Sequence, residues 1–307
     1  MKEEKKDILR KHGYSLTGEE SGAKLCHWVR EKLINGDACY KEDFYGIDCH
    51  RCLQMSPVLD ICNQSCLFCW RYQDHQDQKD IEFDDPKKIV EKSIKAQKRL
   101  VSGFGGEDRC SKEMWEEAKE PNQVAISLAG EPTIYPQLGE LIREYEKRGM
   151  TTFLVTNGTN PNTLEDLEPL PSQLYITLAA PNKDIFNKLC VPNSENLWER
   201  LNESLGILSS LDTRTVIRHT LVKGWNIGWE PEYADLIKRA DPDFIEAKGY
   251  VFVGDSRRRM SIDNMPSHKT IKGFAKKLSN FLSKDTLREK ERSRVVLIGD
   301  DDSDLRL

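Results

Sequence analysis

The sequence lacks several features, and each absence excludes a class of protein. It has no run of about 18 apolar residues, so nothing in it predicts a membrane-spanning helix. Half of residues 1–16 are charged, and the segment lacks the apolar core of a signal peptide, which predicts a cytoplasmic location. The formal net charge is −5, and this argues against a protein that coats nucleic acid without specificity. The sequence also has no internal repeat, which argues against a solenoid.

Cysteine, in contrast, is abundant. The 307 residues contain nine cysteines, and seven of these lie between Cys26 and Cys69. Disulfides are rare in the cytoplasm, so clustering of this kind predicts metal ligands. The two cysteines farther along the chain, Cys110 and Cys190, are expected to be ordinary residues.

Strands and helices are expected to alternate along the chain. Short apolar runs that predict strands lie at 56–61, 123–130, 151–158, 173–180, 214–222, 243–254 and 293–299. Amphipathic segments between these runs predict helices, and about six such units predict an α/β fold with a parallel sheet. Six is fewer than the eight strands of a closed barrel, so the sequence favours a partial barrel.

Three parts of the chain are expected to differ in their roles. Residues 1–55 form a cysteine-rich extension, residues 56–255 form the barrel, and residues 256–307 form a C-terminal extension. The acidic tail, 301–307, is expected to be loose.

The first candidate site is a loop with the spacing C-x3-C-x2-C. It places Cys62, Cys66 and Cys69 directly after a predicted strand. Three thiolates on one short loop can bind three irons of a 4Fe–4S cubane and leave the fourth iron open. That iron can bind the amino and carboxylate groups of S-adenosyl-L-methionine (SAM). The alternative is a structural zinc site, which usually takes four ligands in paired C-x2-C halves.

The loop resembles the cluster-binding signature of the radical SAM superfamily, and residues 127–132 (SLAGEP) resemble its Gly-Gly-Glu motif. The resemblance implies a (βα)6 partial barrel with SAM across the carboxyl ends of its strands. It also implies SAM contacts from Ala129, Gly130 and Glu131, with Ala129 in place of the first glycine. Asn157 ends a predicted strand and is expected to contact SAM; an ordinary turn at Asn157 is the alternative.

A second set of cysteines precedes the first. Twelve residues separate Cys26 from Cys39, and twelve more separate Cys39 from Cys52. The spacing is too wide for one tight loop, but three separate loops could converge on a second cubane. Three buried free cysteines are the alternative, and Cys49 and His50 are rival ligands.

The chain also resembles the archaeal-type tRNA 4-demethylwyosine synthases, radical SAM lyases of the wybutosine pathway. The segments that carry the likeness, besides the two cysteine sets, are 127–136, 153–159, 173–181, 214–226, 246–260 and 264–268. The resemblance implies two 4Fe–4S clusters, the second held by Cys26, Cys39 and Cys52. It implies that tRNA-Phe with N1-methylguanosine beside the anticodon condenses with pyruvate, formate is lost and 4-demethylwyosine forms. It further implies a monomer that depends on an external electron donor, because too few residues precede Cys26 for a flavodoxin-like domain.

Lys41 is the candidate for binding pyruvate. A lysine with a lowered pKa can hold a keto acid as a Schiff base, and Lys41 lies two residues after Cys39. An anionic cluster nearby would raise the pKa of the lysine, so burial must oppose it. An ordinary surface lysine is the alternative.

The RNA is expected to meet the protein near residues 248–259. The methylguanosine must turn out of the anticodon loop to reach a buried radical. Lys248, Arg257, Arg258 and Arg259 are the predicted contacts with tRNA, and Trp70 can stack on a base or pack in the core. Two other functions stay open at this point: a radical SAM maturase that acts on a protein, and a non-enzymatic iron–sulfur protein that binds RNA or senses redox state.

Overall fold

A computed structural model of the chain describes residues 1–73, 81–300 and 305–307. Its centre is a single ten-stranded sheet in the order β1-β2-β3-β4-β5-β6-β7-β8-β10-β9. The six central strands are mutually parallel. They are β3 (Cys52–Ser56), β4 (Gln123–Ile126), β5 (Thr151–Thr156), β6 (Gln173–Thr177), β7 (Arg214–Leu221) and β8 (Phe244–Gly249). This confirms the α/β fold and the partial barrel of six strands that the sequence predicts.

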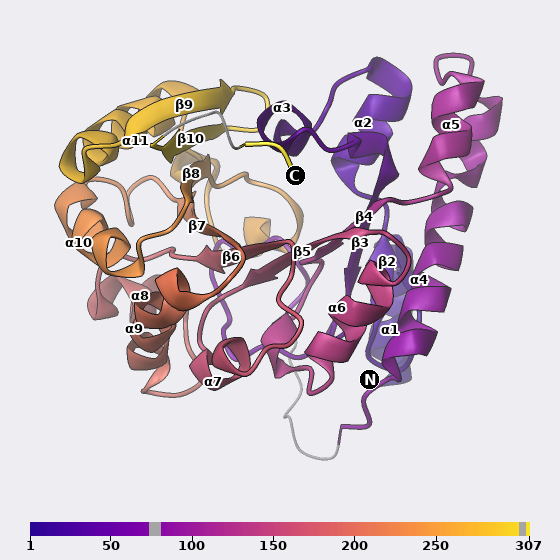
Figure 1. Ribbon diagram of the computed structural model, residues 1–307, viewed down its shortest axis with the longest axis horizontal. Helices are drawn as coiled ribbons and strands as arrows, with labels where there is room; N and C mark the ends of the chain where they lie inside the picture. Colours follow the sequence, from indigo (N-terminus) through magenta and orange to yellow (C-terminus); the bar gives the residue numbers. More distant parts are fainter. Residues whose placement is uncertain (74–80, 301–304) are drawn as a thin grey trace.

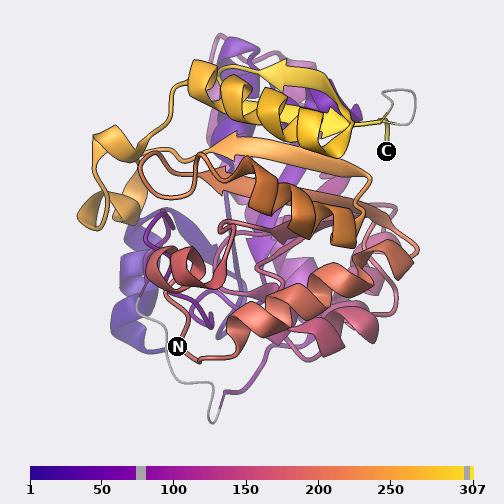
Figure 2. The ribbon, with the colours of Figure 1, turned by 90° about the vertical axis from the view of Figure 1, so that its left-hand side faces the viewer.

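Antiparallel strands cover both edges of the parallel core. Before it come β1 (Tyr14–Leu16) and β2 (Gly22–Lys24), and after it come β9 (Asp285–Lys290) and β10 (Val295–Gly299). In Figures 1 and 2 the C-terminal hairpin, in yellow, therefore lies at the opposite end of the molecule from helix α1 (Glu3–Lys11), in indigo. The two outermost strands, β1 and β9, do not pair with each other, so the sheet does not close into a complete barrel.

Helices connect the parallel strands and cover one face of the sheet. They are α4 (Pro86–Val101), α6 (Leu138–Glu146), α7 (Pro161–Glu165), α8 (Lys183–Leu189), α9 (Leu197–Ile207), α10 (Glu230–Ala240) and α11 (His268–Leu282). Helix α4 begins where the sequence predicts, because the Asp85 side chain accepts a hydrogen bond from the Lys88 N–H and Pro86 takes the first helical position.

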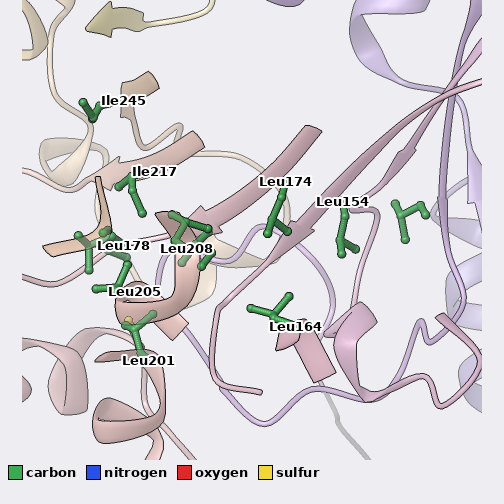
Figure 3. Packing of buried hydrophobic residues seen from close by; sticks show 14 of the residues in the cluster. Leu154, Leu164, Leu174, Leu178, Leu201, Leu205, Leu208, Ile217 and Ile245 are labelled. Carbon is green, nitrogen blue, oxygen red and sulfur yellow. The ribbon is translucent and has the colours of Figure 1, made fainter. Parts of the chain in front are cut away.

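Alternate residues of the strands face opposite sides, as a period of two requires. Leu154, Leu174, Ile217 and Ile245 point toward the helices and form the main core with leucines of α7 and α9 (Figure 3). The residues between them, such as Phe153 and Tyr175, point to the other face. There they pack against α3 (Tyr40–Tyr45) and Leu305.

Two expectations from the sequence are corrected, one about the first barrel strand and one about the C-terminal tail. The strand predicted at 56–61 is instead β3, four residues earlier, and residues 57–61 form a turn. Thus Cys52 begins a barrel strand. The tail is not loose throughout: residues 301–304 lie outside the described residues, but Leu305 is buried and the Leu307 N–H donates to the Tyr45 carbonyl. Among the described residues no helix is long and apolar enough to cross a membrane.

Candidate functional site

The first cysteine set lies on the loop that follows the carboxyl end of β3. Burial raises the pKa of the Cys62 and Cys69 thiols, and the thiol of Cys66 raises both further. The backbone N–H of Gln64 donates to the Cys62 sulfur, and that of Arg71 donates to the Cys69 sulfur. All three cysteines are free of disulfides. The loop thus brings together three thiols that need a positive partner to ionise, and it supplies N–H donors for sulfur ligands.

These thiols fit a cubane better than a single metal ion. Within residues 1–73, 81–300 and 305–307, no three His, Cys, Asp or Glu side chains lie close enough to bind one ion. In a cubane each thiolate binds a different iron, so three sulfurs can stand farther apart than around one zinc ion.

A second segment, which the sequence did not single out, supports the cysteine loop. The N–H groups of Ser65 and Leu67 donate to the carbonyls of Val191 and Leu189, each at 2.9 Å. Val191 has φ 46°, a left-handed conformation that costs a β-branched residue about 1–2 kcal/mol. Next to it, the buried thiol of Cys190 hydrogen-bonds Cys66, so Cys190 is not the isolated residue expected from the sequence.

The SLAGEP segment approaches the same loop after β4. Gly130 has φ 68°, and a Cβ atom there would lie 1.8 Å from the Val58 carbonyl oxygen, so only glycine fits. The Glu131 N–H donates to the Ile61 carbonyl at 2.8 Å. Ala129, in place of the family's first glycine, is tolerated because its carbonyl accepts from Ser56 and its methyl packs in a small apolar cluster.

Glu131 links the ends of two strands rather than presenting a free carboxylate. It is 2% exposed, and burial raises its pKa. One oxygen accepts hydrogen bonds from the hydroxyls of Thr133 and Thr156, each at 2.6 Å, and the other accepts from the Asn157 N–H at 2.8 Å. The carboxylate therefore fixes the ends of β4 and β5 together.

Asn157 belongs to this network and also makes a turn. Its amide donates to the Asn63 side chain at 2.8 Å, while its carbonyl oxygen accepts from the Thr159 hydroxyl at 2.6 Å. Gly158 follows with φ 72°, as a turn requires. The turn at Asn157 is therefore confirmed, and its contact with SAM stays a prediction. Asn63 was missed because no local pattern marks it.

The second cysteine set converges from three segments. Cys26 precedes helix α2 (His27–Asn35), Cys39 precedes α3, and Cys52 begins β3. N–H groups of Trp28 and Val29 donate to the Cys26 sulfur, as expected at the start of a helix. Burial raises the pKa of Cys52 to about 12, and the thiols of Cys26 and Cys39 contribute to that rise. The three thiols are therefore near one another, as convergence of separate loops predicts.

The rival ligands of this set differ in their partners. The Cys49 thiol hydrogen-bonds Cys39, a member of the set, and lowers the pKa of Cys39, and it also lies 3.5 Å from the Trp28 carbonyl oxygen. His50 lies 2.7 Å from the Glu117 carboxylate. His50 thus has a partner outside the set, and the choice of Cys26, Cys39 and Cys52 over Cys49 stays a prediction.

Lys41 extends from α3 over the sheet face next to this set. It is 8% exposed, and its Nζ lies 3.8 Å from the ring centroid of Phe153 and 4.8 Å from that of Tyr175. Burial lowers the pKa of Lys41, and Arg218 lowers it further, while Cys52 and Cys39 oppose the shift. Burial opposes the thiols, as the sequence argument required, so Lys41 is not an ordinary surface lysine.

Lys248 lies on the same face and not among the arginines with which it was grouped. Burial lowers the pKa of Lys248 to about 8, and the ammonium interacts with Cys39 and Cys26. Its Nζ donates to the Ser293 carbonyl at 2.8 Å and lies 4.7 Å from the Tyr40 ring centroid. The contact of Lys248 with tRNA stays a prediction.

The arginine cluster divides into exposed and supporting residues. Arg257 and Arg258 are exposed on a short 3-10 turn, whereas the Arg259 guanidinium donates to the carbonyls of Cys69 and Leu67. The turn packs on the cysteine loop, because the Asp255 N–H donates to the Trp70 carbonyl at 3.1 Å. Trp70 itself is 45% exposed, so a basic and aromatic surface adjoins the first cysteine set.

Comparisons with known proteins agree with this geometry. The family model of the Radical SAM superfamily matches residues 112–237, and the model for wyosine base formation matches residues 239–300. The S-adenosyl-L-methionine-dependent tRNA 4-demethylwyosine synthase of Pyrococcus abyssi is 47% identical over 310 residues, which cover 99% of this chain and 91% of the relative. The protein of the same name from Methanocaldococcus jannaschii is 40% identical over 95% of this chain and 94% of the relative. A solved structure of TYW1 with a lysine-pyruvate adduct bound superposes with a TM-score of 0.90 at 38% identity, over 100% of this chain and 98% of that one.

Proposed function

Because the chain belongs to the family of S-adenosyl-L-methionine-dependent tRNA 4-demethylwyosine synthases, we propose that it condenses N1-methylguanosine of tRNA-Phe with pyruvate to form 4-demethylwyosine. It is a radical SAM enzyme of the lyase type. The observation that carries the proposal is the arrangement of one barrel: a cysteine loop at the carboxyl end of β3, and a buried lysine beside a second cysteine set.

We assign the first cluster to Cys62, Cys66 and Cys69. When bound there, the cluster and SAM supply a 5′-deoxyadenosyl radical. Gly130 lets the SLAGEP backbone come close to the loop, and the Glu131 network fixes Asn157 beside it. Ala129, Gly130, Glu131 and Asn157 then form the surface on which SAM lies.

We assign a second 4Fe–4S cluster to Cys26, Cys39 and Cys52, and pyruvate to Lys41. Burial lowers the pKa of Lys41 and so increases the fraction of molecules that carry the neutral amine. This amine attacks the pyruvate carbonyl and forms a Schiff base with release of water. The lysine-pyruvate adduct in the similar TYW1 structure supports this role for a lysine. The guanidinium of Arg218 and the ammonium of Lys248 favour the carboxylate of a keto acid on this face.

The remaining partners follow from this chemistry. Arg257 and Arg258 contact the RNA backbone, while Arg259 supports the cysteine loop. An external electron donor reduces the first cluster, and the enzyme acts as a monomer in the cytoplasm, where its tRNA substrate is found. Residues 1–55 carry the second cluster, 56–255 the barrel and 256–307 the C-terminal extension, with β3 shared by the first two parts.

The direct test uses anaerobically reconstituted protein, SAM, a strong reductant, pyruvate and tRNA-Phe methylated at N1 of the guanosine beside the anticodon. We expect the 4-demethylwyosine nucleoside in digested tRNA, detected by mass spectrometry, and none from unmethylated tRNA or without pyruvate. SAM cleavage without the nucleoside would favour a maturase that acts on protein. Absence of both would favour a non-enzymatic iron–sulfur protein.

A further inference from the structure

Arg71 is a buried cation that the proposed reaction does not use. It is 6% exposed, and its Cζ lies 3.5 Å from the ring centroid of Trp70. Its Nη1 donates to the Tyr14 hydroxyl at 3.3 Å. Its Nη2 is buried and has no hydrogen-bond partner within the part of the chain that the structure describes.

Within the part of the chain that the structure describes, no carboxylate forms an ion pair with this side chain. Taking an ion out of water is unfavourable unless an opposite charge compensates it, and a guanidinium stays charged in proteins. A negative group that binds beside Arg71 would therefore stabilise its charge.

Sulfurs of both cysteine sets lie close enough to Arg71 to interact with its charge. The guanidinium interacts electrostatically with Cys69 of the first set and with Cys26 of the second. Sequence and fold account for both contacts. Arg71 follows Cys69 by two residues, and Tyr14, on which it packs, belongs to the β1–β2 hairpin that leads to Cys26.

We propose that Arg71 is the shared counter-ion of the two iron–sulfur clusters and raises the reduction potential of both. The inference rests on the proposed function, because it requires both clusters. A cubane with three thiolate ligands is anionic and gains a further negative charge on reduction, so a nearby fixed cation stabilises the reduced form. Arg71 acts through the clusters and is a positioning residue, not a catalytic one.

The chain offers two matched controls, since two other cations lie near one set each. Arg259 donates to the Cys69 carbonyl and interacts with the thiols of Cys66 and Cys69. Lys248 interacts with the thiols of Cys39 and Cys26. Removing either charge tests the effect of one cation on one cluster, while removing the Arg71 charge tests both clusters.

The experiment is a redox titration of the reconstituted full-length protein, followed by electron paramagnetic resonance. The signal that changes on addition of SAM identifies the first cluster. We expect Arg71→Met and Arg71→Gln to make both midpoint potentials more negative. In Arg71→Lys, which keeps the positive charge, both potentials should lie closer to the wild-type values. Arg259→Met is expected to shift only the first potential, and Lys248→Met only the second.

Iron is counted before each titration. A shift of one potential alone, or of neither, in an Arg71→Gln protein that holds both clusters overturns the shared role. Equal shifts in Arg71→Lys and Arg71→Gln also overturn it, because they would show a packing effect and not a charge effect. A wild-type protein with about four irons per chain overturns the second cluster, and with it the shared role, before any potential is measured.

Discussion

The two cysteine sets differ in how the chain builds them. The first occupies one loop of eight residues, Cys62 to Cys69, at the carboxyl end of β3. The second collects single residues from the starts of α2, α3 and β3. One short loop carries all three cysteines of the first site, whereas the second site exists only when three segments have packed. The spacing of cysteines along the sequence is therefore enough to identify a site on one loop, whereas a site built from distant segments can be identified only from the fold.

The two regions also differ in charge. Near the first set, the buried Glu131 raises the pKa of Cys62, whereas the guanidinium groups of Arg71 and Arg259 oppose the rise that burial causes in the pKa of Cys69. Near the second, Lys41, Lys248 and Arg218 share one face with the thiols, and Glu246 pairs with Arg218 at 2.8 Å. A cationic face suits an anionic keto acid. The predicted division of labour is SAM cleavage at the first set and pyruvate binding at the second.

The largest effect is expected from removing one ligand of the first set. In Cys66→Ala, SAM cleavage to 5′-deoxyadenosine should fall to background, since an incomplete cubane cannot present the open iron. The Schiff base between pyruvate and Lys41 should still form. Chromatography of the nucleosides and borohydride trapping of pyruvate measure the two outcomes on the same sample. Loss of both functions together would break the division between the regions.

Lys41→Ala tests the other region. Product should be lost while both clusters and SAM cleavage remain, because the amine that holds pyruvate is gone. Mass mapping of the trapped wild-type adduct should find it on Lys41. Lys248 is the matched control, since it is the other lysine on this face with a lowered pKa. An adduct on Lys248, or full product formation by Lys41→Ala, would remove Lys41 from the mechanism.

Gly130→Ala should weaken the SAM-binding surface beside the first cysteine set, because the added Cβ atom would push the backbone of residue 130 away from that of Val58. The left-handed φ alone costs about 1–2 kcal/mol, and the new Cβ would meet the Val58 carbonyl at 1.8 Å. We expect weaker SAM binding by calorimetry and a lower melting temperature. Gly149→Ala is the control, with φ 70° and no atom within 4 Å of its Cβ. It should show only the conformational cost; equal SAM affinity in the two variants would contradict the close approach.

The smallest effect concerns the surface beside the first set. The double change Arg257→Glu and Arg258→Glu should weaken tRNA binding by roughly tenfold or more and reduce the slope of log affinity against log salt by about 2, if each arginine contacts one phosphate. SAM cleavage without tRNA should not change. Affinity measured at several salt concentrations checks this, with Lys248→Met as the comparison. A larger loss of tRNA affinity in Lys248→Met would place the RNA at the second region.

The sequence predicted the first region better than the second, for a physical reason. The loop ligands, the SLAGEP turn and the start of α4 depend on neighbouring residues, so local patterns revealed them. The support from residues 189–193, the contact of Cys190 with Cys66 and the burial of Arg71 depend on packing between distant segments. Lys248 was grouped with the arginines because it is near them in sequence, but alternation along β8 turns it to the opposite region.

We propose that one chain holds two separable cubanes, and counting the iron bound by Cys39→Ala tests this most directly. Wild-type protein, reconstituted without oxygen, should contain about eight irons per chain, and Cys39→Ala about four. The variant should still convert SAM to 5′-deoxyadenosine under strong reductant. An unchanged iron content in Cys39→Ala, or the loss of all iron together with SAM cleavage, would contradict the account.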